Sequence, residues 1–252
     1  MKQFGSIYEL ETGYTKIFVI SGRKNILVDT GSKPLPDAVV GFMEQTGFSF
    51  GTDALRRQVQ EGSYPGIKGL LEKEGLKIDV IICTHYHGDH VGNLKRLRDE
   101  LQVPVALHPL DIPFVDGTQQ VPAPYPIPEE IIQHLAVEHC GVDIQLQDGE
   151  FVDEDVQVIH VPGHTMGSIC LLVKNRILIT GDCMVGRNDM NPMMGQDELN
   201  LPVEMFSTDY GRAVKSLEKL LAYDFETLLP GHGTSLAGGG KEKLRALLNK
   251  RA

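Results

Sequence analysis

The sequence predicts an α/β (α+β) protein whose functional site lies at the ends of its strands. Short apolar runs typical of buried strands alternate with stretches in which apolar residues recur at helical spacing. Several of these runs are followed at once by histidine or aspartate, and open α/β sheets place ligands beyond the carboxyl ends of their strands. The 252 residues can bury one well-filled core, so we expect a single domain over residues 1–252.

The first half of the chain is predicted to begin with strands and to continue with helices. Alternating apolar residues bounded by turns predict three strands, at residues 2–10, 14–20 and 23–29. Apolar residues at helical spacing predict helices at residues 35–46, 66–73 and 89–101, the last two separated by a strand at 80–83. In the last helix, Val91, Leu94, Leu97 and Leu101 form one apolar stripe.

The second half repeats this alternation of strands and helices. Strands are expected at residues 103–107, 143–147, 156–160, 167–173, 176–180 and 227–229. Helices are expected at 208–223, with Thr208 as the N-cap, and at 240–250. Residues 47–65 and 184–206 show no clear periodicity, and we expect these two loops to shape a substrate pocket.

The run His85-Tyr86-His87-Gly88-Asp89-His90 is the most informative segment of the chain. It gathers three of the nine histidines and one carboxylate directly after an apolar strand pattern. Neutral imidazole and carboxylate are ligands that zinc prefers. A histidine-rich surface loop is the alternative, but further residues of the ligand type follow later apolar runs.

Each of these later residues follows a strand pattern and a glycine, which lets the backbone approach an ion closely. They are His164, Asp182 and His232. With the first segment they complete a predicted ligand set: His85, His87, Asp89, His90, His164, Asp182 and His232. Seven ligands exceed the needs of one four-coordinate zinc, whereas two neighbouring ions would use them all.

The HxHxDH run, followed in order by a lone His, Asp and His, resembles the metallo-β-lactamase superfamily of hydrolases. The Asp29-Thr30-Gly31 turn matches an early motif of that family. The resemblance implies a four-layer αββα sandwich of the metallo-β-lactamase type. It also implies that His85, His87 and His164 hold one ion, that Asp89, His90 and His232 hold a second, and that Asp182 bridges them. Asp29 would then orient a ligand histidine, although an ordinary turn carboxylate remains the alternative reading.

The resemblance predicts a metal-dependent hydrolase with two divalent ions, zinc being expected and iron or manganese being alternatives. A hydroxide bridging the metals would attack a small-molecule ester, lactone, thioester or related bond, with Asp89 orienting the nucleophile and moving its proton. Lactonases of the family place tyrosine where this chain has Val185, so the resemblance does not select one substrate class. A mononuclear iron oxidoreductase resembling persulfide dioxygenases is the alternative function, and a non-catalytic metal-binding protein is a third.

Composition restricts the partners. The net charge is −10 and no basic run is present, which disfavours nucleic acid and favours a small-molecule substrate. No apolar run is long enough to cross a membrane, and no secretory signal is visible, so a cytoplasmic location is expected. The four cysteines lack Cys-x-x-Cys spacing and are expected to be buried free thiols, with Cys183 facing away from the metals. The oligomeric state is not predicted.

Overall fold

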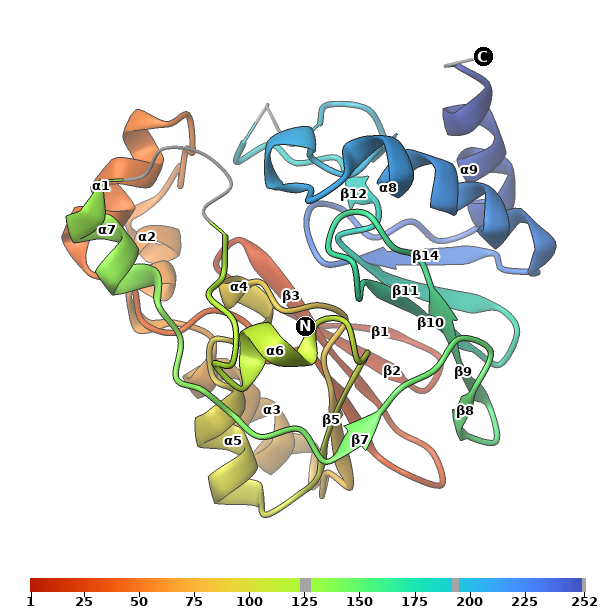
Figure 1. Ribbon diagram of the computed structural model, residues 1–252, viewed down its shortest axis with the longest axis horizontal. Helices are drawn as coiled ribbons and strands as arrows, with labels where there is room; N and C mark the ends of the chain where they lie inside the picture. The colour runs from red at the N-terminus through yellow and green to blue at the C-terminus, as the bar shows by residue number, and fades with distance from the viewer. Residues whose placement is uncertain (123–127, 192–194, 251–252) are drawn as a thin grey trace. The chain divides into compact units, whose positions relative to one another are not determined.

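The computed structural model describes residues 1–122, 128–191 and 195–250. The chain divides into two compact units, each of which contains one large sheet (Figure 1). Unit 1 comprises Met1–Leu107 and Ile112–Gln145, and unit 2 comprises His108–Asp111 and Leu146–Ala252. The single domain over residues 1–252 stays a prediction.

The sheet of unit 1 has seven strands in chain order, antiparallel at its start and parallel from its fourth strand onward. The strands are β1 (Lys2–Phe4), β2 (Ile7–Thr12), β3 (Thr15–Ile20), β4 (Ile26–Val28), β5 (Val80–Ile82), β6 (Val105–Leu107) and β7 (Ile144–Gln145). Because β4 and β5 are parallel neighbours, their carboxyl ends lie side by side. The sheet therefore brings Asp29 next to the residues that follow Ile82.

Two hydrophobic clusters hold the helices of unit 1. The helices are α1 (Asp37–Gln45), α2 (Asp53–Glu61), α3 (Tyr64–Glu74), α4 (Gly88–Val91), α5 (Leu94–Leu101), α6 (Ile112–Val115) and α7 (Glu129–Leu135). The larger cluster packs Ile67 of α3 and Leu94 of α5 with Ile81 of β5. A smaller cluster joins α1, α2 and α7 through residues such as Val59 and Ile131.

The sheet of unit 2 has five strands in the order β14-β11-β10-β9-β8. Its strands are β8 (Phe151–Asp153), β9 (Val156–His160), β10 (Ile169–Val173), β11 (Ile177–Gly181) and β14 (Thr227–Pro230), and a separate pair joins β12 (Val185–Gly186) to β13 (Leu199–Asn200). β11 and β14 are parallel, so the two turns that carry Asp182 and His232 emerge at the same edge. A hydrogen bond from Gly231 N to Gly181 O, 2.9 Å long, joins these turns.

The helices of unit 2 are α8 (Tyr210–Ser216), α9 (Gly240–Asn249) and the 3₁₀ helices η2 (Glu204–Phe206) and η3 (Leu217–Ala222). Of these, η3 and α9 pack on the sheet through one apolar cluster. Leu217 and Leu220 of η3 and Leu244 of α9 are buried with Leu172 and Leu178 of the sheet. Among the described residues, none of the helices has the length and apolarity that crossing a bilayer requires.

Four predicted elements differ from the structure. The strand expected at 2–10 is two strands separated by a turn at Gly5, whose φ is +59°. The helix expected at 89–101 is interrupted between α4 and α5, where Asn93 Nδ2 donates to the carbonyls of Thr30 and Ser32. Buried side-chain hydrogen bonds thus replace helical ones at this point.

The other two differences concern a helix that was not predicted and a helix whose start and form differ. Residues 47–65 are not wholly irregular, because Thr52 caps α2 by accepting a hydrogen bond from Leu55 N. The helix expected at 208–223 is α8 followed by η3, and its N-cap is Asp209 in place of Thr208. Part of the expected loop at 184–206 falls on residues 192–194, which lie outside the described residues.

We predict that Gly163→Ala destabilises unit 2 strongly. Gly163 has φ +134°, and a Cβ there would lie 2.1 Å from Ala213 N, so backbone strain and overlap act together. The free energy of unfolding should fall by about 3 kcal/mol in urea titrations. Gly47→Ala is the matched control, because Gly47 has φ +100° but open space around it, and should cost only about 1 kcal/mol. Equal losses in the two variants would contradict this account.

Candidate metal centre

The ligand candidates of unit 1 are arranged around Asp29, which follows β4 with a left-handed φ of 62°. Its buried carboxylate accepts hydrogen bonds from Thr84 N at 2.7 Å and from Thr84 Oγ1 at 2.9 Å. Its Oδ2 also lies 2.8 Å from His90 Nδ1. The Asp29 oxygen accepts this hydrogen bond, so the proton of His90 is on Nδ1 and its lone pair is on Nε2, as metal ligation through Nε2 requires.

His85 is oriented by the same carboxylate through Thr84. The Thr84 hydroxyl gives its proton to Asp29, so its oxygen accepts from His85 Nδ1, which is 3.1 Å away. The proton of His85 is then on Nδ1 and its lone pair is on Nε2, the tautomer that metal ligation through Nε2 requires. Thr84 was missed by the sequence analysis, because a threonine at the end of a strand carries no distinct signal. The interpretation of Asp29 as an ordinary turn residue is wrong, since its hydrogen bonds to Thr84 and His90 hold residues 84–90, the motif loop, in place.

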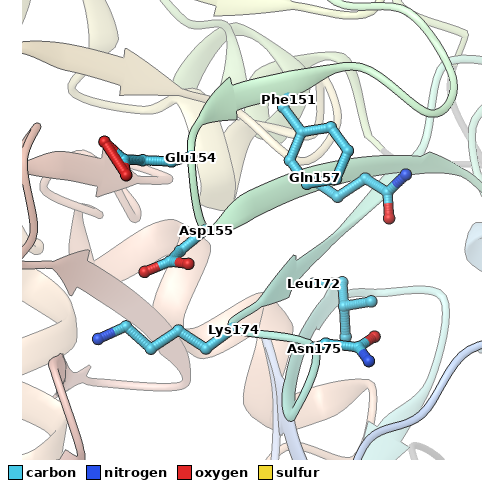
Figure 2. Close-up of a pocket in the computed structure, with 7 residues that line it drawn as sticks. All are labelled: Phe151, Glu154, Asp155, Gln157, Leu172, Lys174 and Asn175. Carbon is cyan, nitrogen blue, oxygen red and sulfur yellow. The ribbon is translucent and has the colours of Figure 1, made fainter.

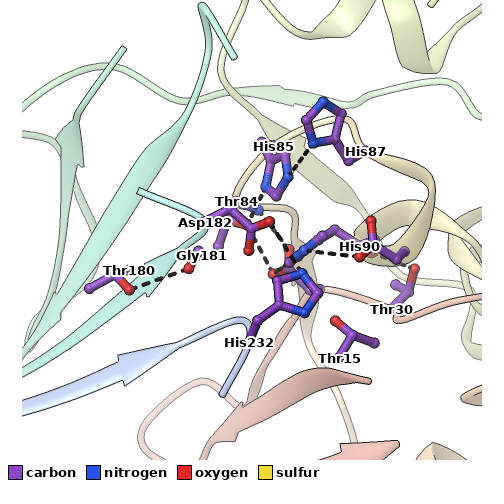
Figure 3. A network of polar contacts seen from close by, with 12 residues as sticks. Thr15, Thr30, Thr84, His85, His87, His90, Thr180, Gly181, Asp182 and His232 are labelled. Atoms are coloured by element: carbon purple, nitrogen blue, oxygen red, sulfur yellow. Dashed lines mark hydrogen bonds and ion pairs between the residues drawn. The ribbon is translucent and has the colours of Figure 1, made fainter. Parts of the chain in front are cut away.

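The remaining ligands of unit 1 lie close to these two histidines. His87 Nδ1 is 3.0 Å from His85 Nε2, and Asp89 Oδ2 is 3.9 Å from His90 Nε2. Figure 3 shows His85, His87 and His90 near Thr84. Two ligand atoms on one tetrahedral zinc are roughly 3.4 Å apart when the bonds are about 2.1 Å long. The ring nitrogens of His85 and His87 therefore fit a shared ion with little movement.

The ligand candidates of unit 2 converge on one oxygen of Asp182. His232 Nε2 lies 3.2 Å from Asp182 Oδ2, and Figure 3 shows these two residues together. His164 Nε2 lies 3.6 Å from the same oxygen. His164 Nδ1 is 3.4 Å from Ser207 Oγ, whose own hydroxyl donates to Val203 O. The hydroxyl oxygen can therefore accept from His164 Nδ1, which leaves Nε2 directed at the carboxylate. A carboxylate placed between two imidazoles suits a metal-bridging role.

Most of these side chains are shielded from water. The exposed fractions are 1% for His85, 0% for His90, 2% for His164 and 2% for His232, whereas the Asp89 side chain is 23% exposed. Buried imidazoles and carboxylates require partners, and divalent ions meet that requirement. In each unit the donor types and their spacing fit divalent metal ions. Asp89 and His87, both half-buried, are the ligand candidates that solvent reaches most easily.

The cysteines behave as predicted. All four are free and buried. Cys183 Sγ faces Val161 O at 3.7 Å within the apolar cluster of unit 2, as expected for a side chain that points away from Asp182. Burial raises the pKa of the Cys83 thiol, and a side-chain hydrogen bond with Cys170 together with burial raises the pKa of Cys183. The thiols of Cys83 and Cys183 are therefore protonated packing groups.

Two hollows lie outside these ligand sets. One, of about 420 Å³, is lined by residues of the β8–β9 and β10–β11 hairpins, including Phe151, Asp155 and Lys174, and by none of the predicted ligands (Figure 2). The other, of about 500 Å³, is lined in unit 1 by Phe48, Phe50 and Arg56 among others. The second hollow belongs to the segment 47–65 that we expected to shape a substrate pocket, and that role stays a prediction.

The comparisons with known proteins agree with the fold and the motifs. A family model described as "Metallo-beta-lactamase superfamily" matches residues 11–232. The chain belongs to this superfamily, whose members are mostly metal-dependent hydrolases. It is 30% identical over 180 residues to "Probable metallo-hydrolase YflN" of Bacillus subtilis, which covers 66% of this chain and 68% of the relative.

Two solved structures share the fold. TTHA1429 from Thermus thermophilus aligns with a TM-score of 0.66 at 18% identity, covering 98% of this chain and 79% of that one. TTHA1623, solved in a di-iron-bound form, aligns with a TM-score of 0.59 at 22% identity, covering 97% and 96%. The predicted metallo-β-lactamase fold class is thereby confirmed.

We predict that Asp29→Asn weakens metal binding by about 10- to 100-fold, because an amide cannot fix the tautomers of His85 and His90 as a carboxylate does. The dissociation constant for Zn²⁺ should be measured by competition with a chromogenic chelator. Asp79→Asn is the control, since Asp79 accepts a hydrogen bond from Asn25 N at the opposite ends of β4 and β5. Unchanged zinc affinity in Asp29→Asn would contradict the orienting role.

A second prediction concerns pH and the stacked pair of His108 and His160 in unit 2. Their ring centroids are 3.9 Å apart, and His160 Nε2 donates to Met166 O at 2.9 Å. Burial, with a smaller contribution from His160, lowers the pKa of His108 from 6.5 to about 4. The unfolded chain then binds more protons than the folded one, so stability falls as the pH drops from 6.5 toward 4 and levels off below.

Replacing His108 by phenylalanine keeps an aromatic ring and removes this titration. The acid-induced loss of unfolding free energy should shrink by up to about 3 kcal/mol, at roughly 1.4 kcal/mol per pKa unit. Urea titrations at several pH values between 4 and 7 measure the change. His134→Gln, at an exposed position of α7, is the control and should keep the wild-type pH dependence. A His108→Phe curve parallel to wild type would refute the assignment.

Proposed function

We propose that this protein is a hydrolase that uses two divalent metal ions, most simply zinc, to cleave a small-molecule ester, lactone, thioester or related bond. The observation that carries the proposal is the convergence of His164 and His232 on Asp182 Oδ2, as a bridging carboxylate requires. Membership of the metallo-β-lactamase superfamily and the name of the Bacillus subtilis relative support it. The net charge of −10 supports a small molecule over nucleic acid as substrate.

The proposed ligand assignment joins the two sets. His85, His87 and His164 would hold one ion, Asp89, His90 and His232 would hold the other, and Asp182 would bridge both. The tautomers fixed by Asp29 and Thr84 support this assignment, because they put the ring proton on Nδ1 and the lone pair on Nε2 in both His90 and His85. Zinc is proposed first because imidazole and carboxylate suit it, and the di-iron form of TTHA1623 makes iron the second metal to test.

The chain's own residues then have separate tasks. When bound, a pair of divalent ions would supply a hydroxide nucleophile at neutral pH and polarise the oxygen of the electrophile. Asp89, the more exposed of the two carboxylates in the predicted ligand set, would accept a hydrogen bond from the attacking water and take up its proton. Asp29 would not touch the substrate and would act by holding His85 and His90 in orientation.

We predict that removing the metals abolishes hydrolysis and that Zn²⁺ restores it. The experiment uses a chromogenic panel of lactones, thioesters, esters and β-lactams on protein whose metal content is measured before and after chelation. Asp182→Asn should lower activity by more than about 100-fold, since it removes the bridging charge. Asp197→Asn, at an exposed residue that pairs with Lys250 in unit 2, should leave activity unchanged.

Two outcomes would overturn this proposal. One is full activity in protein shown to contain no metal. The other is one iron per chain with persulfide-dependent O₂ consumption and no hydrolysis, which would establish the alternative oxidoreductase function.

A further inference from the structure

Lys33 lies on the loop that leaves the Asp29 turn, and its backbone is held against the helix that carries His90. Gly92 N donates to Gly31 O at 2.9 Å, and a Cβ at Gly92 would lie only 2.5 Å from Lys33 N. Asn93 Nδ2 donates to Ser32 O at 2.8 Å on the same loop. These close contacts fix the start of the Lys33 side chain relative to the metal-binding motif.

The Lys33 side chain ends beside the motif loop within unit 1. Its Nζ donates a hydrogen bond to the carbonyl oxygen of Ala136, which is the residue that caps the end of α7. The residues on either side of Ala136 pack against Gly88. A Cβ added to Gly88 would lie 3.6 Å from Leu135 O and 3.4 Å from Val137 Cγ1. Gly88 separates the ligand candidates His87 and Asp89. The ammonium group therefore lies next to the segment that presents both ligands.

The charge of Lys33 is poorly compensated for a half-buried group. No carboxylate of the described side chains lies within 4.0 Å of Lys33 Nζ. Burial lowers the pKa of the ammonium, and the more distant Glu138 acts in the opposite direction. A lysine ammonium has three donors, and the described structure gives this one a single carbonyl acceptor. Donors and charge are thus left for an anionic ligand.

We propose that Lys33 is a specificity-determining residue that binds an anionic group, of the size of a carboxylate, on the substrate. This inference rests on the proposed hydrolase function and narrows it to substrates with a negative charge near the scissile bond. A charge-assisted hydrogen bond from a partly desolvated ammonium is stronger than a neutral one. The acidic chain would otherwise repel such substrates, so a local cation beside the motif has a direct use.

The test compares two thioesters that differ in one charge: the mono-thioester of glutarate and the same compound with its free carboxylate converted to an amide. In the zinc-loaded wild type, kcat/KM should be at least about tenfold higher for the anionic thioester. Lys33→Met should reduce this preference to less than about threefold, mainly through KM, and should leave the neutral thioester unaffected. Lys33→Arg should retain most of the preference, and Lys77→Met, at an exposed lysine of the same unit, should retain all of it.

A binding measurement separates this inference from the proposed function. Calorimetry should show glutarate binding about tenfold more tightly than butyrate to zinc-loaded wild type, with the difference lost in Lys33→Met and reduced by salt. If neither thioester is hydrolysed, the hydrolase proposal fails, and the glutarate-to-butyrate ratio still decides the role of Lys33. The same ratio in wild type and Lys33→Met, or a loss confined to thermal stability, would overturn the inference and leave Lys33 as a packing contact to Ala136.

Discussion

The carboxylate of Asp29 is the group on which the motif loop depends. A buried charge must be matched by donors, and Asp29 meets Thr84 N, Thr84 Oγ1 and His90 Nδ1. These contacts join the ends of two parallel strands to a short helix, because Asp29 follows β4, Thr84 follows β5 and His90 belongs to α4. The left-handed backbone conformation at Asp29 costs free energy, and these hydrogen bonds offset that cost. Tautomer control at two histidines is therefore a consequence of how one strand ends.

Unit 2 uses the same geometry with different residues. Its parallel pair, β11 and β14, delivers Asp182 and His232 to one edge, and Gly163 lets the His164 turn pack closely against Ala213 of α8. Parallel neighbouring strands end in register, so a ligand after each strand needs only a short turn to reach its neighbour. This explains why Asp182 and His232 each follow an apolar run with a glycine beside the ligand candidate.

Much of this could be predicted from the sequence, and the remainder has identifiable causes. Periodicity located most strands of the two large sheets, because apolar strand patterns are local properties of the chain. It did not locate α2, whose N-cap Thr52 lies among glycines and phenylalanines that resemble a loop. It could not foresee the break at Asn93 or the role of Thr84, since both depend on partners some 55 to 63 residues away. Long-range side-chain hydrogen bonds carry no signal in a single sequence.

The separation between strand ends and loops also bears on substrate choice. The predicted ligands sit where strands terminate, and their orientation is fixed by buried bonds that leave little freedom to vary. Lys33, the hollow beside Phe48 and Phe50, and the segment after α7 belong to connections that the sheet does not constrain. Because a loop can change its charge without disturbing Asp29, specificity can change while the ligand geometry is retained. An ammonium on the first loop after Asp29 is the simplest way to combine a retained ligand geometry with a changeable substrate specificity.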